Sequence, residues 1–398
     1  MTRILTLCAL AALATAPAQA QGDQPDPEDG ELVLTTAVPF LQIEPDSRAS
    51  GMGMAGVAVA DNAYAPFWNP AGLAGQQGTE VSFTHAPWLP ALGANLSYEH
   101  LSAKHGMGSA GTLGGHLTYF DLGTQQATDE QGRDLGQFSS YEFALGASYG
   151  YPVTENFAVG TGARLIYSNL TGGRDVLSRT TSAGVSFGVD LGVKYDGPDL
   201  GLGQSSRPTV ALSLANMGPG ISYTQENEFP DAIPTTLRLG TALDTQLDDF
   251  NRLLLAFDVN KVVVTPRRNA DGELEYDPFY KALFTSWQER TIKTVDVPNK
   301  TCDDLAVDDD SANDCEQISG LRSVTLGLGA EYWYNDLFAL RTGYFYEDPA
   351  NGNRQFLTFG TGFRYSLVGV DISYIYALQE NSPLADQLRF SLLLNVPR

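Results

Sequence analysis

Two short stretches place a serine between glycines, in the spacing of a hydrolase nucleophile elbow. They read GASYG (146–150) and GVSFG (184–188), and both match G-x-S-x-G. A nucleophile elbow requires a sharp turn between a strand and a helix, together with a positioned base. Both stretches instead lie inside runs where small and large residues alternate, and none of the four histidines has an evident partner. We therefore expect strands here and no enzyme. Hydrolysis by Ser148 or Ser186 is the enzymatic alternative.

A second motif, GMGMAG (51–56), matches the G-x-G-x-x-G pattern that cradles a dinucleotide pyrophosphate. That role requires a preceding strand, a following helix and an acidic residue about twenty positions later, all within a βαβ unit. No βαβ pattern follows this motif. Small residues at this spacing also allow two backbones to approach closely, so we predict a packing role and no bound cofactor.

An acidic stretch lies between Cys302 and Cys315. Its carboxylates could suggest calcium, but the D-x-[DN]-x-[DN]-G pattern of a calcium loop is absent. A solvated loop tip is the expected state, without a metal. Because exported compartments are oxidising, we predict a disulfide between these two cysteines.

The first twenty residues have the features of a secretory signal peptide. Arg3 precedes a short apolar run, and Ala18-Gln19-Ala20 is a small-x-small cleavage site. The run is too short to cross a bilayer as a helix. Cys8 lies inside the run, too early for a lipid-anchored cysteine. The prediction is an exported chain, and the net charge of −23 argues against nucleic-acid binding.

From Thr79 onward the hydrophobic pattern has the period of two that strands produce. Between residues 141 and 151, for example, Tyr, Phe, Leu and Ala alternate with Glu, Gly and Ser. Charged residues recur on the polar face: Glu142, Arg164, Asp190, Lys194, Arg238, Asp258, Glu331, Arg341, Arg364, Asp371 and Arg389. This face would be the exterior of a soluble sandwich but the interior of an outer-membrane barrel.

The length and number of the strands favour the barrel. We expect fourteen strands at residues 79–87, 93–104, 109–122, 138–153, 157–171, 181–196, 208–217, 235–245, 251–265, 321–335, 337–347, 354–366, 368–379 and 386–397. A tilted strand needs about 9–11 residues to cross a membrane, whereas sandwich strands usually have about 5–6. Short and long connections mostly alternate, as in barrels with short periplasmic turns and long outer loops. The predicted fold is an all-β, fourteen-stranded antiparallel barrel over residues 79–398, with a long outer loop at 266–320.

Aromatic residues gather toward the ends of these strands, where membrane interfaces lie. The groups are Tyr149/Tyr151, Tyr332-Trp333-Tyr334, Tyr344/Tyr346 and Tyr374/Tyr376. We predict that they form two girdles around the barrel.

Residues 21–78 precede the barrel and contain an apolar, glycine-rich part at 34–75. This part is too interrupted for a membrane helix and needs an enclosure to pack in. It resembles the N-terminal signature of the PorV/PorQ family of the type IX secretion system, within the FadL-like barrels. The residues that carry the resemblance are Pro39, Phe40, Leu41, Pro45, Asp46, Arg48, Gly51, Gly53, Gly56, Asp61, Trp68, Asn69 and Pro70. Asn216-Met217-Gly218-Pro219 is also similar to a family feature.

The resemblance implies a fourteen-stranded barrel in a Gram-negative outer membrane, surrounded by lipid, with residues 21–78 as a periplasmic or plug segment. It implies no enzymatic activity. Proteins of this kind bind the C-terminal signal domain of secreted cargo, receive it from the translocon barrel SprA, and pass it to a surface attachment complex. The chain ends in Asn395-Val396-Pro397-Arg398 and not in an aromatic residue, so Phe390 could serve in its place.

Other functions remain open on the sequence. A FadL-like transporter of hydrophobic compounds would need an apolar pocket near the plug, and a PorQ-like member would differ mainly in its partners. From Pro266 to Gly320 there are thirteen Asp or Glu against six Lys or Arg. These acids could steer a basic cargo surface, or could simply keep the loop soluble.

Overall fold

The computed structural model describes residues 36–90, 95–128, 133–173, 181–224, 230–268, 274–293, 315–379 and 382–396. The predicted signal peptide (1–20) lies outside these ranges. Cys302 does too, and with it the predicted disulfide to Cys315.

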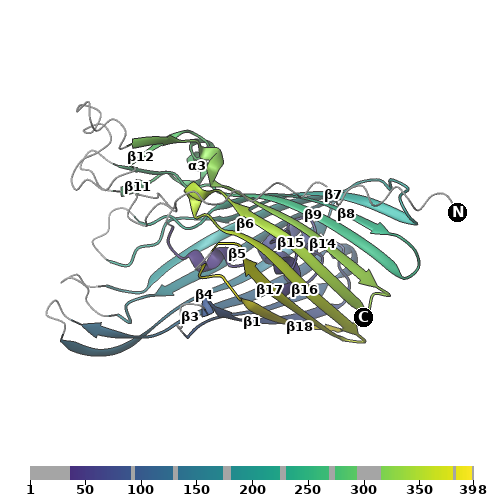
Figure 1. Ribbon diagram of the computed structural model, residues 1–398, viewed down its shortest axis with the longest axis horizontal. Helices are drawn as coiled ribbons and strands as arrows, with labels where there is room; N and C mark the ends of the chain where they lie inside the picture. The colour runs from purple at the N-terminus through teal and green to yellow at the C-terminus, as the bar shows by residue number, and fades with distance from the viewer. Residues whose placement is uncertain are drawn as a thin grey trace. The chain divides into compact units, whose positions relative to one another are not determined.

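Fourteen strands of the described chain form a closed barrel in which each strand pairs antiparallel with its neighbours (Figure 1). They are β1 (Thr79–Trp88), β2 (Leu96–Gly106), β3 (Thr112–Thr128), β4 (Asp134–Pro152), β5 (Phe157–Asn169), β6 (Gly184–Asp196), β7 (Ser205–Met217), β8 (Thr236–Gln246), β9 (Asn251–Val262), β14 (Val324–Tyr334), β15 (Phe338–Glu347), β16 (Gln355–Tyr365), β17 (Val368–Ala377) and β18 (Leu388–Val396). β1 closes the ring by pairing with β18, from Thr79 opposite Val396 to His85 opposite Phe390. The predicted fold is confirmed.

The remaining elements are short. They are η1 (Pro39–Gln42), α1 (Ser47–Ser50), α2 (Ala65–Trp68), η2 (Pro70–Leu73), η4 (Gly108–Ala110), β10 (Pro266–Arg268), β11 (Leu274–Tyr276), α3 (Phe279–Thr285), β12 (Arg290–Lys293), β13 (Cys315–Ile318), η6 (Gly320–Ser323) and η7 (Pro349–Asn351). β10 pairs with β11 and β12 with β13, as two separate ladders.

The two faces of the wall follow the alternation of the sequence. On β4, Leu145 is 55% exposed and Glu142 only 2%. Large apolar side chains therefore point outward, where a membrane would cover them, and charged ones point into the lumen. Nine of the eleven charged residues of the predicted polar face are buried: Glu142, Arg164, Asp190, Arg238, Asp258, Glu331, Arg341, Asp371 and Arg389. The other two, Lys194 and Arg364, are partly exposed.

The aromatic side chains mark two levels of the wall. Tyr141 stacks with Tyr119 and with Tyr167, each at 5.9 Å between ring centroids, near the end that carries the long loops. Tyr149 and Tyr151 stack at 6.4 Å near the end that carries the short turns. We call these the loop end and the turn end. They correspond to the outer and periplasmic sides of a bacterial barrel.

Trp333 does not belong to either girdle, contrary to the sequence prediction. Its side chain is 8% exposed, and Arg341 and Arg364 each lie 5.5 Å from its ring. Glu331 on the same strand also faces the lumen, so the period of two places Trp333 inside with it.

Residues 36–78, the N-terminal segment, supply much of the molecule's hydrophobic core. In Figure 1 the short purple helices of this segment are seen within the outline of the barrel. α1 contacts β16, β17 and β18, and η2 contacts β4, β5 and β6. Met52, Val57, Tyr64 and Trp68 belong to one buried cluster, which also contains wall residues such as Phe345. A second cluster combines segment residues with wall residues and with Ile221 and Ile233 from the β7–β8 connection: Val38, Phe40, Leu41, Ile43, Ala86, Tyr98, Phe120, Ala144 and Ile166.

Candidate functional site

The candidate site is the N-terminal segment together with the lumen residues that hold it and the cavities beside it. Asp46 organises the segment. As the N-cap of α1, it accepts a hydrogen bond from the Ala49 N–H at 2.5 Å, which satisfies a donor that the helix leaves unpaired. Its second carboxylate oxygen accepts from Trp68 Nε1 at 2.9 Å. Burial is the main influence on this group and raises the pKa of Asp46 to about 6.

Arg48, two residues further along the chain, ties the segment to the wall. Its guanidinium donates to both carboxylate oxygens of Glu331 on β14, through Nε at 2.9 Å and Nη2 at 2.8 Å. The third nitrogen, Nη1, forms an ion pair at 2.5 Å with Asp61 of the segment itself. The fork of arginine suits this bidentate geometry. Arg48 therefore fixes two parts of the segment on one wall residue.

The network continues along the wall. Arg341 on β15 donates to Glu331 at 2.6 Å and to Asp371 on β17 at 2.8 Å. Arg364 on β16 also contacts Asp371, at 2.5 and 3.0 Å. Glu331 and Arg341 have fully buried side chains, so each charge depends on its partners for solvation. The segment thus completes a charge array that four neighbouring strands contribute to.

The last glycine of the motif, together with the residue after it, donates to a carboxyl group of the wall. The N–H groups of Gly56 and Val57 both donate to one carboxylate oxygen of Asp258 on β9, at 2.7 and 2.8 Å. Successive backbone N–H groups commonly form such anion-binding concavities. The geometry supports the predicted packing role.

Glycines on both partners make this packing possible. A Cβ on Gly343 of β15 would lie 2.1 Å from the backbone nitrogen of Gly53, and one on Gly329 of β14 would lie 2.4 Å from the Met52 carbonyl oxygen. Gly53 itself has φ +63°, a conformation that favours glycine. Gly51 likewise lies against Gly360 of β16, with its own Cβ position 3.1 Å from the Gly360 Cα. The motif therefore docks on a glycine-lined patch of the wall.

Asn69 and Pro70 dock on the opposite side of the lumen. Asn69 caps η2 by accepting from the Ala71 N–H, and its amide donates to the Val193 carbonyl on β6 at 3.0 Å. A Cβ on Gly192 of β6 would meet Asn69, and one on Gly160 of β5 would meet Pro70. The segment is consequently held between two glycine-lined patches.

A chain of hydroxyl groups reaches the seam where the barrel closes. Ser47 of the segment is hydrogen-bonded to Ser391 of β18 at 2.9 Å. Ser391 is bonded to Thr84 of β1 at 2.7 Å, and Thr84 to Tyr64 of the segment at 2.7 Å. Two parts of the segment thus meet on the first and last strands of the barrel.

Every signature residue named from the sequence lies on this segment. All are buried except Pro39 and Asp61; the Asp61 side chain keeps 51% of its surface exposed. The two motif serines lie elsewhere, within β4 and β6. Ser186 donates to the Pro219 carbonyl at 2.9 Å. Among the described residues, neither serine is hydrogen-bonded to a histidine.

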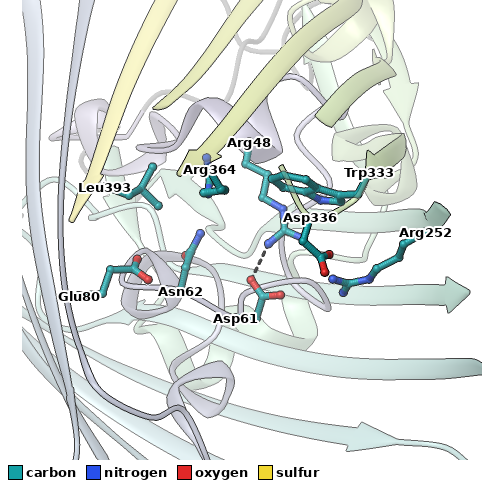
Figure 2. A pocket seen from close by; sticks show the side chains of 9 residues that line it. All are labelled: Arg48, Asp61, Asn62, Glu80, Arg252, Trp333, Asp336, Arg364 and Leu393. Carbon is teal, nitrogen blue, oxygen red and sulfur yellow. Dashed lines mark hydrogen bonds and ion pairs between the residues drawn. The ribbon is translucent and has the colours of Figure 1, made fainter. Parts of the chain in front are cut away.

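A polar cavity of about 250 Å³ lies at the turn end, beside the Arg48–Asp61 pair (Figure 2). Figure 2 shows Asn62 and Glu80 on one side of this pair, and Arg252 and Asp336 on the other. Glu80 accepts from the Ala63 N–H at 2.9 Å, so the cavity lining also anchors the segment.

A larger cavity of about 660 Å³ lies at the loop end. Its lining is mixed. Apolar side chains come from both the segment and the wall: Phe40, Met54, Phe67, Trp68, Trp88, Phe120, Phe345, Phe356, Ile375 and Leu384. Arg238, Lys261, Arg354 and Arg389 supply positive charge, and Glu44 and Glu347 supply negative charge. Arg238 lies 4.7 Å from the Phe67 ring and donates to the Phe67 carbonyl.

The partners of the signature could not be read from the sequence. Glu331, Asp371 and Asp258 follow the inward period, but nothing in the sequence says which of them Arg48 meets. The structure explains the residues Asn216-Met217-Gly218-Pro219, which mark the point where the chain leaves β7 and turns into the lumen. Asn216 adopts φ +59°, and its backbone N–H donates to the Asp190 carboxylate at 2.8 Å. The connection then turns inward, so that Ile221 becomes fully buried.

None of the helices in the described ranges has the length and hydropathy of a membrane-spanning helix. Those same ranges contain no group of three or more His, Cys, Asp or Glu arranged to hold a metal ion.

Comparison with known families gives one match that covers more than half of the chain. The model described as "Type IX secretion system protein PorV" matches residues 26–268. No curated protein matches the sequence.

Several solved structures match the chain at low identity. The toluene transporter TbuX of Ralstonia pickettii is 16% identical, with a TM-score of 0.46, and the match covers 89% of this chain and 98% of TbuX. The CymD monoaromatic hydrocarbon channel is 15% identical, with a TM-score of 0.48 and the same two coverages. A FadL homologue of Pseudomonas aeruginosa is 12% identical, with a TM-score of 0.44 and coverages of 88% and 98%.

Proposed function

Because the chain belongs to the PorV family of type IX secretion proteins and is an outer-membrane β-barrel of that system, we propose that it is a cargo-binding shuttle. It binds the C-terminal signal domain of secreted cargo at the loop end, receives it from a SprA-type translocon barrel, and passes it to the surface attachment complex. The observation that carries this proposal is the family match, which spans the whole N-terminal segment and the strands up to β9. Members of this family are secretion components and not enzymes.

The N-terminal segment is proposed to act as a plug, following a cleaved signal peptide at residues 1–20. Its ion pairs with Glu331 and its fit against glycines on both sides of the lumen support a fixed position. A fixed plug gives the loops at the outer end a rigid base, and it keeps the lumen from conducting while cargo is handled at the surface. A disulfide between Ser47→Cys and Ser391→Cys would test this. If the locked protein still supports secretion, the plug does not need to leave.

A pull-down from native cells tests the shuttle directly. The tagged chain should recover a SprA-type barrel or cargo that carries the signal domain, while an unrelated tagged outer-membrane barrel should recover neither. Deletion of the gene should also block export of proteins with that domain. Unchanged export would remove the proposal. A PorQ-like role would appear as recovery of a different set of secretion partners.

The acidic outer loop is proposed to steer basic cargo toward the barrel. Replacing the six aspartates between Cys302 and Cys315 by asparagine should lower the on-rate for cargo and weaken its dependence on salt. Asp248→Asn with Asp249→Asn, in the turn between β8 and β9 at the turn end, is the control. Equal on-rates in both variants and the wild type would assign the acids to solubility alone.

The loop-end cavity favours a second candidate, a FadL-like transporter of hydrophobic compounds. Its apolar lining lies directly against the N-terminal segment, where such a transporter would hold its ligand. Native mass spectrometry of protein purified in mild detergent is the discriminating measurement. A stoichiometric co-purified amphiphile that is lost in Phe67→Arg would support transport, whereas an empty cavity with intact cargo binding would support the shuttle.

A further inference from the structure

One hairpin of the barrel extends beyond the membrane wall. The pairing of β2 with β3 ends where Ser97 faces Asp121, but the pairing of β3 with β4 continues until Thr128 faces Asp134. Tyr141, at the level of the loop-end girdle, faces Asp121. Residues 124–128 therefore lie outside the membrane. We call them the β3 arm.

A built-in bend separates the arm from the wall. The register of β3 against β4 shifts between Asp121 and Thr124. Gly123 adopts φ +73°, and its N–H donates to the Asp121 carboxylate at 2.8 Å. Such a bulge increases the twist of a strand and redirects it. As a result the arm keeps β4 on one side and loses β2 on the other.

The open side of the arm is the side that faces away from β4. No strand in the described part of the chain pairs with residues 124–128 on that side. Thr124, Gln125, Gln126 and Thr128 are exposed. Residues 122–128 also contain no proline, lysine or other charge, although natural proteins normally protect exposed edges with such residues.

The opposite edge of the hairpin is formed by β4, and the connection after β5 lies against it. Ser140 on β4 donates to the Leu170 carbonyl at 2.6 Å, and Gly172 packs against the Phe138 side chain. The connection after β5 therefore contacts the β4 side at Phe138 and Ser140. Within the described ranges, the edge of this hairpin that lacks such a contact is the β3 arm.

We propose that the β3 arm captures an extended segment of secreted cargo by β-strand addition. This inference rests on the proposed shuttle function and names its contact surface. Five residues extend about 17 Å at ~3.3 Å each, the length of an ordinary short strand. Main-chain hydrogen bonds supply the affinity in this mode, and side chains add selectivity. The side chains of the arm are uncharged threonine, glutamine and alanine, so the backbone would supply most of this contact.

A pair of proline variants tests the proposal, because successive residues direct their N–H groups to opposite sides of a strand. Of Gln125→Pro and Gln126→Pro, one removes a donor from the open edge and the other removes a donor from the β4 ladder. Binding is measured with the isolated C-terminal signal domain of a native cargo as the probe and the full chain in nanodiscs. Amide exchange on the unbound wild type identifies the edge residue, since its N–H exchanges faster.

The edge variant should bind the probe about tenfold more weakly and keep the exchange protection of the hairpin. The matched control Gln126→Ala should bind within twofold of wild type, because it changes a side chain only. In the wild type, alternate amides of the arm should become protected when the probe binds.

Three results would overturn the inference. Full binding by both proline variants without new protection would place the contact elsewhere and leave the shuttle function intact. Pairing of two arms in a dimer of this chain would replace cargo as the occupant. A wild type that binds no signal domain would remove both the arm's role and the shuttle function.

Discussion

At the scale of single residues, the lumen is organised around Arg48. This side chain joins Glu331 of the wall to Asp61 of the N-terminal segment, so one guanidinium serves two kinds of partner. The Glu331 side chain is fully buried, whereas Asp61 is half exposed. Charge pairs inside a protein depend strongly on both partners, while exposed pairs contribute little. The two halves of the Arg48 contact should therefore differ greatly in their contribution to stability.

Glu331→Gln should lower the free energy of unfolding by about 3 kcal/mol, because it leaves two buried guanidinium groups with one fewer negative partner. Asp61→Asn is the control, and its effect should not exceed about 1 kcal/mol. Both are measured by urea unfolding in lipid vesicles, followed by the heat-modifiable shift of the barrel on gels. Equal losses in the two variants would contradict the assignment.

Asp46 gives a pH-dependent prediction. Burial raises the pKa of this carboxyl from 3.8 to about 6 in the folded state, so its contribution is complete below pH ~4 and is lost as the pH rises through 6. The difference in unfolding free energy between wild type and Asp46→Asn should change by up to about 3 kcal/mol between pH 4 and 7. Unfolding titrations at pH 4, 5, 6 and 7 measure it. A difference that does not vary with pH would show that the hydrogen bonds from Ala49 and Trp68 hold the group ionised.

At the scale of elements, the packing of the N-terminal segment depends on positions that carry no side chain. Gly51 and Gly53 approach the backbones of β14 to β16, and Asn69 and Pro70 approach those of β5 and β6. The wall carries glycine at the facing positions. Close backbone contact of this kind leaves no room for a Cβ, so the fit is set by glycines on both partners.

Gly343→Ala should displace the segment, because the added Cβ would lie 2.1 Å from the Gly53 nitrogen. A cost of about 1–3 kcal/mol is expected for such overpacking. Limited proteolysis of the folded protein should then cut within residues 36–78. Gly115→Ala on β3 is the matched control, since its Cβ would meet only the Gly146 carbonyl oxygen at 3.6 Å. Equal resistance of both variants to protease would refute the close fit.

The sequence predicts the positions of the strands better than the contacts between side chains in the lumen. All fourteen strands were expected near their observed places, because lipid outside and polar groups inside enforce a strict period of two. The end of β3 was missed: the prediction stopped at residue 122, and the strand runs to Thr128. Threonine and glutamine on both faces give no alternation to read there. The charge array was missed for a related reason, since the period assigns a face but does not identify the partner across the lumen.

At the scale of the whole molecule, the barrel has apolar side chains on its outer surface and polar ones in its lumen. The apolar outer band lies between two levels of tyrosine side chains, and the distance between these levels gives its height. Tyr141 and Tyr151 on β4 lie ten residues apart, about 33 Å along the strand at ~3.3 Å each. At a tilt of ~40° this spans about 25 Å, the height of a typical apolar band. Leu145 lies between the two levels.

Leu145→Arg should reduce the stability of the inserted barrel by about 2–4 kcal/mol, as expected near the bilayer midplane. Leu202→Arg is the control. It is similarly exposed, at 53% against 55%, but it lies in the turn between β6 and β7, outside the membrane. Folded yield in vesicles and urea midpoints measure both. Similar losses would place the membrane elsewhere on the wall.

The hydroxyl chain at the seam has a consequence for the order of assembly. Ser47 of the N-terminal segment is hydrogen-bonded to Ser391 of β18, the last strand in the chain, and Tyr64 to Thr84 of β1, the first strand. Thr84 and Ser391 are bonded to each other across the seam. The part of the chain that leaves the export machinery first is therefore held by the strand that leaves it last. A finished ring would have to admit the segment through its lumen. A barrel that has not yet closed can instead assemble around the N-terminal segment. The segment would then serve as a template that brings β1 and β18 together.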